Sequence, residues 1–205
     1  MALRRFLRVF LGSLPARQVP KSGLQIEGVV TLETREGGKL RQRVQGTNIC
    51  TLTGREFFAE LAALQAFSPR ATFRDDRLAY FGLGTGAQAE VANITGLVQP
   101  VPYVTGEFLA AVQVPATFPA SSTTRTSVQL IREYGRSEVS LGSTVVLTEA
   151  GMYSDGDPSS NWAIGSRPTD YATASADAPF FYKAFEPVAN TPDLTLRLTW
   201  EVRFV

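Results

Sequence analysis

The residues that most often carry enzyme chemistry are scarce in this chain. Among its 205 residues there is no histidine and only one cysteine, Cys50. The lack of histidine removes histidine-dependent triads, most zinc and iron sites and the commonest general base. Cys50 lies in an apolar stretch, so we interpret it as a small buried hydrophobic residue. With a single cysteine, neither a disulfide within the chain nor a cysteine metal cluster can form.

The acidic residues do not form a recognisable metal or catalytic pattern. Asp75 and Asp76 are adjacent, and Asp155 and Asp157 flank a glycine. A calcium loop needs more oxygen ligands at set spacing, including a bidentate glutamate. Paired carboxylates of the glycosidase type are possible by residue type, but no pair stands at a suggestive place. We therefore expect no catalytic residue, no metal and no cofactor.

One glycine-rich stretch occupies residues 82–86. It is not a phosphate-binding loop, because no Gly-Lys-Ser/Thr follows it. It also lacks the spacing of the dinucleotide-binding fingerprint and the helix pattern after it. The stretch predicts a tight turn or bulge at the end of a strand.

Three aromatic residues lie in or near a loop-like segment rich in Asp, Ser and Gly. They are Tyr153, Trp162 and Tyr171. Exposed aromatic rings on a loop can bind sugars, so these residues are candidates for contact with a glycan. The other interpretation is that they fold back on the domain or are buried at a subunit contact.

The N-terminal segment has a helical pattern and a basic charge. Residues 1–21 contain five basic and no acidic residues, whereas the rest of the chain has a net charge of −4. Apolar residues recur at i, i+3, i+4, i+7 and i+8, with arginines on the opposite side. This arm could dock on a partner, pack on its own domain or lie on a membrane surface. The partner-binding residues that we predict are Leu3, Arg4, Arg5, Phe6, Leu7, Arg8, Phe10 and Leu11.

We divide the chain into an arm and linker at 1–22 and a folded domain at 23–205. Arg8 interrupts the apolar part of the arm, so a secretory signal is not expected. No apolar run approaches the roughly 20 residues that span a bilayer. The overall net charge of +1 does not indicate a bulk nucleic-acid binder, and we expect no specific nucleic acid partner.

The domain itself has the pattern of many short strands. One internal helix is predicted from about residue 53 to 67, because Thr53 and Glu56 have the spacing of a capping box. A Glu36-Gly37-Gly38 turn predicts a β-hairpin over 24–45. Further strands or extended segments are predicted at 78–81, 98–103, 112–118, 126–134, 139–147, 180–185 and 194–204.

The last strand has the clearest alternation. Six apolar residues from Leu194 to Phe204 alternate with polar ones, so one face of this strand should be buried. Strands in succession without strand–helix–strand alternation indicate an antiparallel sheet. The predicted fold is mainly β: an antiparallel β-sandwich with one internal α-helix and an N-terminal amphipathic helical arm.

Four segments of the chain resemble a family of small virion structural proteins of tailed bacteriophages. The segment 45–54 is similar to the family's N-x-x-x-x-x-G entry to a helix, and 80–86 to its I-x-x-G-x-G-T strand end. Residues 147–153 resemble I-T-E-A-G-L-F, and 181–188 with 192–202 resemble the closing F-x-P-V and D-x-L-x-V-x-W-x-I strands. The order and spacing match over 24–204. The chain departs from the pattern at Asn190, in the long arm and in a long segment after Gly86.

The resemblance implies a β-sandwich that is part of a particle and has no catalysis. It implies a virion location, other virion proteins (capsid, neck or tail) as partners, and a homo-oligomer. We also expect Glu149 to accept backbone N–H bonds at a turn, and Gly151 to supply a special backbone angle. The alternative function is a receptor- or glycan-binding module of a tail fibre, and an enzyme is the third.

Overall fold

In the computed structural model the chain is described over residues 26–63, 78–86, 88–103, 107–113, 127–139, 142–154 and 178–204. The predicted arm and linker at 1–22 lie outside these residues. The described part contains eight strands and one helix: β1 (Ile26–Glu36), β2 (Lys39–Cys50), α1 (Leu52–Ala63), β3 (Leu78–Gly84), β4 (Leu109–Ala111), β5 (Ser127–Tyr134), β6 (Val145–Ser154), β7 (Phe181–Asn190) and β8 (Thr195–Phe204).

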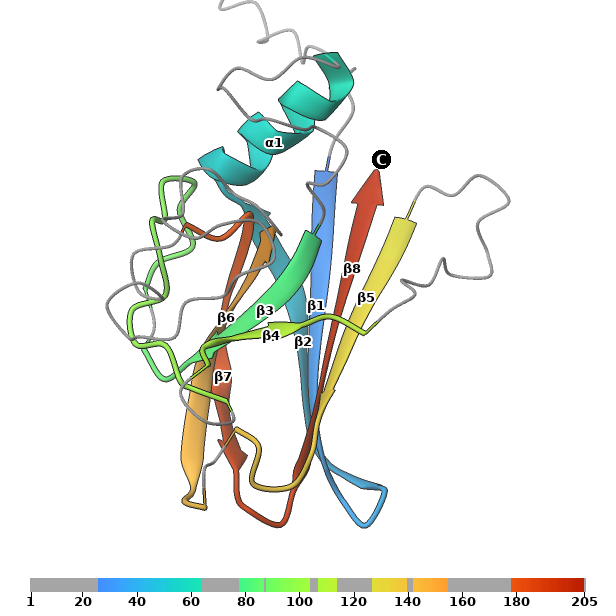
Figure 1. Cartoon of the computed structure of the whole chain (residues 1–205), viewed down its shortest axis with the longest axis vertical. Helices are drawn as coiled ribbons and strands as arrows, with labels where there is room; N and C mark the ends of the chain where they lie inside the picture. Colours follow the sequence, from blue (N-terminus) through green and yellow to red (C-terminus); the bar gives the residue numbers. More distant parts are fainter. Residues whose placement is uncertain are drawn as a thin grey trace, which may run out of the picture.

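The strands form a single antiparallel sheet that curls into a nearly closed barrel (Figure 1). Its strand order is β4-β3-β6-β7-β2-β1-β8-β5, and each pairing is antiparallel. The two end strands approach each other next to β4, where the Gln113 N–H donates to the Ile131 carbonyl of β5 at 2.6 Å. This hydrogen bond brings the two ends of the sheet together.

The sheet has two halves that are joined weakly in the middle. We call β2, β1, β8 and β5 the first half-sheet, and β4, β3, β6 and β7 the second. They are connected through β2 and β7 by two residue pairs, Ile49 with Tyr182 and Cys50 with Phe181. The predicted sandwich of two separate sheets is therefore replaced by one sheet, because β2 runs beyond its predicted end at residue 45 and reaches β7.

The β1–β2 hairpin confirms the predicted turn. Glu36 pairs with Lys39 across Gly37 and Gly38, whose φ angles are +54° and +83°. Two positive φ angles are typical of a type I′ turn, which matches the twist of the strands and favours glycine at both positions. The register shifts by one residue between Thr34 and Arg35, which places a bulge near this turn.

The internal helix is confirmed, but it begins earlier than predicted. The Gly54 N–H donates to the Thr51 hydroxyl at 3.1 Å, and the Arg55 N–H donates to the Thr51 carbonyl. Thr51 is thus the N-cap, in place of Thr53. The helix lies across one end of the barrel (Figure 1), and the Phe58 ring contacts Phe181 and Phe204 edge-on with centroids 5.9 Å apart.

Two predicted strands are shifted along the chain. Of the strand expected at 112–118, residues 112 and 113 are not in a strand and 114–118 lie outside the described part, while β4 occupies Leu109–Ala111 just before it. The strand expected at 139–147 begins at Val145, because residues 142–144 form a turn in which Gly142 has a φ of +85°. Residues 99–101 run alongside the end of β3, as predicted for an extended edge segment.

The main core lies between the two half-sheets. Alternate residues of β8 are buried, and Trp200 is the largest of them. Its ring stacks on Phe81 of β3 at 5.9 Å and lies 6.3 Å from the ring of Phe181 in β7. The predicted burial of one face of the last strand is confirmed, and this face holds the halves together.

Candidate functional site: the gap between β2 and β7

The outer face of the second half-sheet is covered by the chain itself. Residues 88–103 cross it, and Ile94 and Leu97 are buried there against a small cluster of aromatic and aliphatic side chains. The members of that cluster from the sheet are Ile49, Tyr80, Leu109, Tyr153, Tyr182 and Ala184. The covering segment therefore has an apolar core of its own, separate from the core inside the barrel.

A buried carboxylate fixes this covering segment to the sheet. Glu149 of β6 is fully buried, and its oxygens accept the N–H groups of Val98 and Gln99 at 3.2 and 3.0 Å. The Tyr182 hydroxyl donates to the same carboxylate at 3.0 Å. Burial raises the pKa of this hydroxyl, which keeps it protonated as a donor. The expected structural role of Glu149 is confirmed, although it acts from the middle of a strand.

The glycine-rich stretch makes room for these contacts. The stretch begins in the last residues of β3, at a strand end as predicted, but Gly82 and Gly84 continue the strand without the predicted tight turn or bulge, and the strand packs closely on its outer side. A Cβ at Gly84 would lie 2.4 Å from a Glu149 oxygen and 2.8 Å from the Gln99 carbonyl. Gly151 is also required for close packing, and not for the special backbone angle that we expected. A Cβ added there would lie 3.0 Å from atoms of Pro179 and Tyr153.

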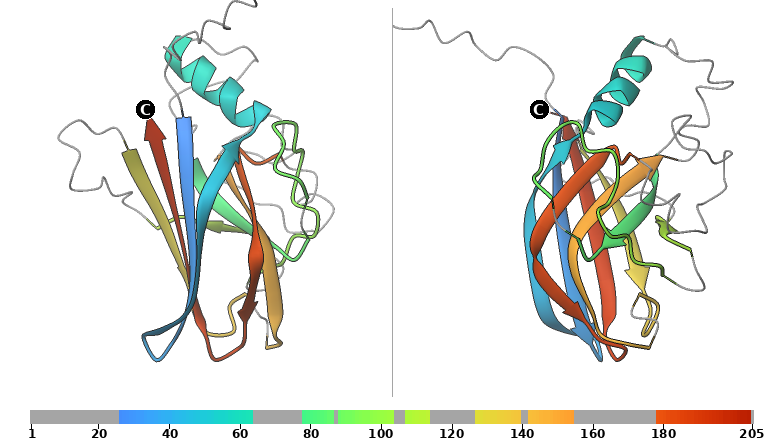
Figure 2. Two further views of the ribbon diagram at one scale, coloured as in Figure 1. Left: turned by 180° about the vertical axis from the view of Figure 1, so that it is seen from behind. Right: turned by 90° about the vertical axis from the view of Figure 1, so that its left-hand side faces the viewer.

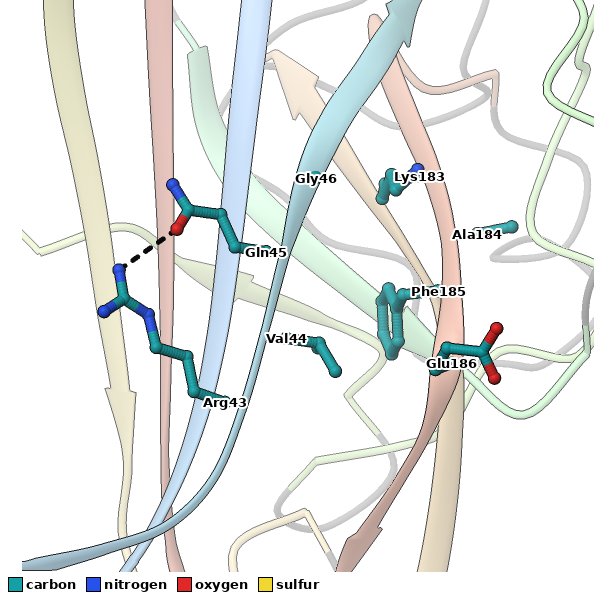
Figure 3. A pocket seen from close by; sticks show the side chains of 8 residues that line it. All are labelled: Arg43, Val44, Gln45, Gly46, Lys183, Ala184, Phe185 and Glu186. Carbon is teal, nitrogen blue, oxygen red and sulfur yellow. Dashed lines mark hydrogen bonds between the residues drawn. The ribbon is translucent and has the colours of Figure 1, made fainter.

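A gap in the barrel wall lies next to this covered face. Below the two residue pairs that join β2 to β7, the strands separate around a groove of about 620 Å³. Four residues of each strand line it, namely 43–46 and 183–186. Figure 3 shows Val44 and Phe185 beside each other between the strands, whereas Arg43 and Gln45 extend away from the groove. The Gln42 amide spans the strands further along by donating to the Pro187 carbonyl at 3.0 Å.

Lys183 accounts for part of this separation. By alternation along β7 it shares a face with Phe181 and Phe185, which pack on the inner core. Its side chain instead passes over Gly46, where an added Cβ would lie 2.9 Å from the lysine Cε. The ammonium reaches the Glu90 carboxylate at 2.6 Å. A lysine at an apolar position thus leaves the barrel through the gap.

Glu90 also takes the place of a neighbouring strand. The same oxygen that binds Lys183 accepts the Ala184 N–H at 3.2 Å. Side-chain groups therefore satisfy part of the β7 edge where β2 has moved away. Strand edges of this kind can recognise another extended chain through backbone hydrogen bonds. The gap therefore offers polar groups that can form hydrogen bonds and one amine, that of Lys183, which is paired with Glu90.

The sequence-predicted contact residues are not brought together by the described structure. Tyr153 belongs to β6 and is only 2% exposed, so its ring is not a surface contact for a glycan. Trp162, Tyr171 and the eight predicted residues of the arm lie outside the described residues. Cys50 is partly buried against the core, and burial raises the pKa of its thiol to about 11 despite the opposing effect of Arg55.

Sequence reasoning did not single out Glu90 or Lys183. The signal for Lys183 is the break that a charged residue makes in an otherwise apolar face of Phe181 and Phe185. Glu90 gives no such signal, because its segment has weak patterning and its partners are more than 90 residues away along the chain.

Among the described residues there is no group of three or more metal-ligating side chains that could hold a metal ion. No helix within the same ranges has the length and apolar character required to cross a membrane. Comparisons with family models, curated proteins and solved structures found no match.

Proposed function

We propose that this protein is a non-enzymatic structural component of a tailed phage particle, present in multiple copies and contacting other virion proteins. The observation that carries the proposal is the position of the four resembling segments in the fold. They fall on the entry to α1, on β3, on β6 and on β7 with β8. These are the elements that build the core and hold its covering segment.

The polar residues within these segments support an architectural role. Glu149 binds two backbone N–H groups and a hydroxyl, and the Thr148 hydroxyl donates to the Gly86 carbonyl at 2.7 Å. Thr51 caps α1 and donates to the Pro179 carbonyl at 2.6 Å. Each group has a fixed partner in the backbone. We infer that the segments maintain a rigid scaffold whose surface makes the functional contacts.

The N-terminal segment supplies the attachment in this proposal. As a helical arm with arginines on one side, it would dock in a groove on a neighbouring virion protein. Tethering to the folded domain would raise its effective concentration at that groove. The place in the particle would then be set by the partner that carries the groove, in the tail, neck or baseplate region or on the capsid surface.

Purified particles provide the test. Mass spectrometry of particles and labelling by antibody should find the full-length protein in multiple copies. A variant lacking residues 1–14 should fold normally, as judged by circular dichroism, and should be missing from particles. Normal incorporation of the truncated protein would contradict the role of the arm, and absence of the intact protein from particles would overturn the proposed function.

A separate outcome identifies the alternative of receptor binding. A Trp162→Ala variant that is incorporated normally but abolishes attachment to host cells would favour a receptor- or glycan-binding module. If attachment is unchanged, the scaffold proposal stands.

A further inference from the structure

A row of alternating charges crosses the outer face of the first half-sheet. Strand register places Glu33 of β1 opposite both Arg43 of β2 and Arg197 of β8, and Arg197 opposite Glu133 of β5. The order across the four strands is therefore positive, negative, positive, negative. Within the row, Arg43 lies 3.7 Å from Glu33, and Arg197 lies 3.7 Å from Glu133.

The most exposed members of this charge row are its two ends. The side chains of Arg43 and Glu133 are 51% and 58% exposed, compared with 14% for Glu33 and 36% for Arg197. The exposed ends carry opposite charges. On one side of the row Arg35 contacts Glu33 at 2.7 Å, and on the other side Thr31 is paired to Thr199 at the centre of the face. These small threonine side chains let the centre of the face approach a partner closely.

No part of the chain that the structure describes covers this face, in contrast to the outer face of the second half-sheet. In the left view of Figure 2 no described segment lies over β5, β8, β1 and β2. On the other half-sheet, residues 88–103 cover the sheet with their own apolar core. The described residues thus cover the outer face of the second half-sheet and not that of the first.

We propose that the occupant of this face is a second copy of the chain, packed face to face about a two-fold axis parallel to the strands. This axis, placed between β1 and β8, reverses the order of the charge row in the partner. Arg43 then faces the second copy's Glu133, and Glu33 faces its Arg197. A two-fold axis along the row would instead place like charges opposite each other, which is costly.

A second pair of charges satisfies the same symmetry. Glu27 of β1 lies opposite Arg203 of β8 in the register. The same two-fold axis brings Glu27 of each copy onto Arg203 of the other. The symmetry is thus fixed by two separate rows, and it holds whether or not the protein belongs to a phage particle.

Charge reversal of the exposed ends gives a decisive test. The full-length protein should be dimeric by sedimentation velocity, and the dimer should weaken as salt rises. Arg43→Glu and Glu133→Arg should each raise the dissociation constant by roughly tenfold or more, because each creates two like-charge contacts. An equimolar mixture of the two variants should restore a dimer, since every contact across the axis is again between opposite charges.

Two matched variants control for net charge. Lys39→Glu and Glu186→Arg reverse exposed charges outside the row, and their dimers should match the wild type. Circular dichroism checks that each variant is folded. A monomeric wild type overturns the proposal, as does a dimer that both row variants leave intact. Failure of the mixture to restore a dimer overturns the proposed axis, since only that axis joins the two altered ends.

Discussion

The outer faces of the two half-sheets differ in whether a described segment covers them, although both halves share one core. In the first half-sheet the ladders are long: β1 pairs with β8 over ten residue pairs and β5 with β8 over eight, without a register shift. In the second, β3–β6 and β6–β7 are each interrupted by a shift. The first half-sheet has one shift, beside its hairpin turn between Thr34 and Arg35, whereas the second half-sheet needs close-packed glycines and a buried carboxylate to hold its cover.

In this fold, the half-sheet with the longer unbroken ladders is not the one that carries its own covering segment. The outer face of the first half-sheet carries paired charges, and no described residue lies over it (Figure 2). The second half-sheet is sealed by its own covering segment, fixed through Glu149 and Glu90. Its glycines let the segment come close to the sheet, because a Cβ at Gly84 would collide with Glu149 and the Gln99 backbone, and one at Gly82 would press on the side chains of Leu97 and Leu109.

The largest expected effect comes from breaking the contact that the halves share. Trp200→Ala should lower the free energy of unfolding by about 3–5 kcal/mol, since Trp200 is fully buried between Phe81 and Phe181. Equilibrium unfolding in urea measures this change. Trp200→Phe should cost clearly less, because an aromatic ring remains; equal losses for both variants would show that ring packing is not the cause.

The second prediction addresses the sealed half alone. Glu149→Ala should cost about 2–4 kcal/mol, because it leaves two backbone N–H groups and the Tyr182 hydroxyl without their acceptor. Hydrogen exchange should rise at Val98 and Gln99 and stay unchanged in β1 and β8. Uniform loss of protection across the whole sheet would contradict the idea that Glu149 acts locally.

A matched carboxylate in the open half should matter much less. Glu33→Ala removes contacts with Arg35 at 2.7 Å and with Arg43 at 3.7 Å, both on the outer face. Surface ion pairs contribute little, so the expected loss is at most about 1 kcal/mol for the monomer. Urea unfolding at low protein concentration measures it, and a loss as large as that of Glu149→Ala would remove the distinction between the halves.

The smallest effect on stability at neutral pH is expected at Cys50, which pairs with Phe181 where β2 and β7 join the two half-sheets. Burial raises the pKa of the thiol to about 11 from an ordinary 9.0. Between these values the folded state keeps a proton that the unfolded state loses, so stability should fall as pH rises from about 9 to 11. Below pH 9 the thiol should have no influence.

Melting curves between pH 8 and pH 10 for the wild type and Cys50→Ala test this dependence. The variant should lose less stability over that interval. Tyr182 and Tyr134 also have raised pKa values, but as tyrosines they act mainly above pH 10. Identical pH profiles would show that the thiol ionises equally in both states.

Sequence patterns predicted the local elements better than their connections. The alternation of β8, the glycine turn after Glu36 and the presence of one internal helix are confirmed. The exact N-cap was wrong, because Thr51 makes contact with the 179–180 backbone, which lies far away along the chain. The shifted starts of β4 and β6 have the same origin, since the ends of strands depend on which neighbours are in reach.

The candidate site was largely hidden from the sequence. Its two main residues, Glu90 and Lys183, lie 93 positions apart and meet only because residues 88–103 fold over β7. The three predicted aromatic contacts gave no such site: Tyr153 is buried, and the other two lie outside the described residues. Spacing along the chain carries no information on such a pair, because only the fold brings a residue of the covering segment next to a strand residue so distant in sequence.

The sequence by itself determined the strands, because alternation of apolar and polar residues assigns each side chain to a face before any partner is known. It also determined the tight turn, since two adjacent glycines favour positive φ angles. Only the tertiary structure decided that the strands form one curled sheet, that β2 and β7 part around Lys183, and that the described residues cover one outer face and not the other. These features depend on long-range register and close approach, and the physical reason is that hydrophobic burial specifies which face is inside but not which strand lies alongside.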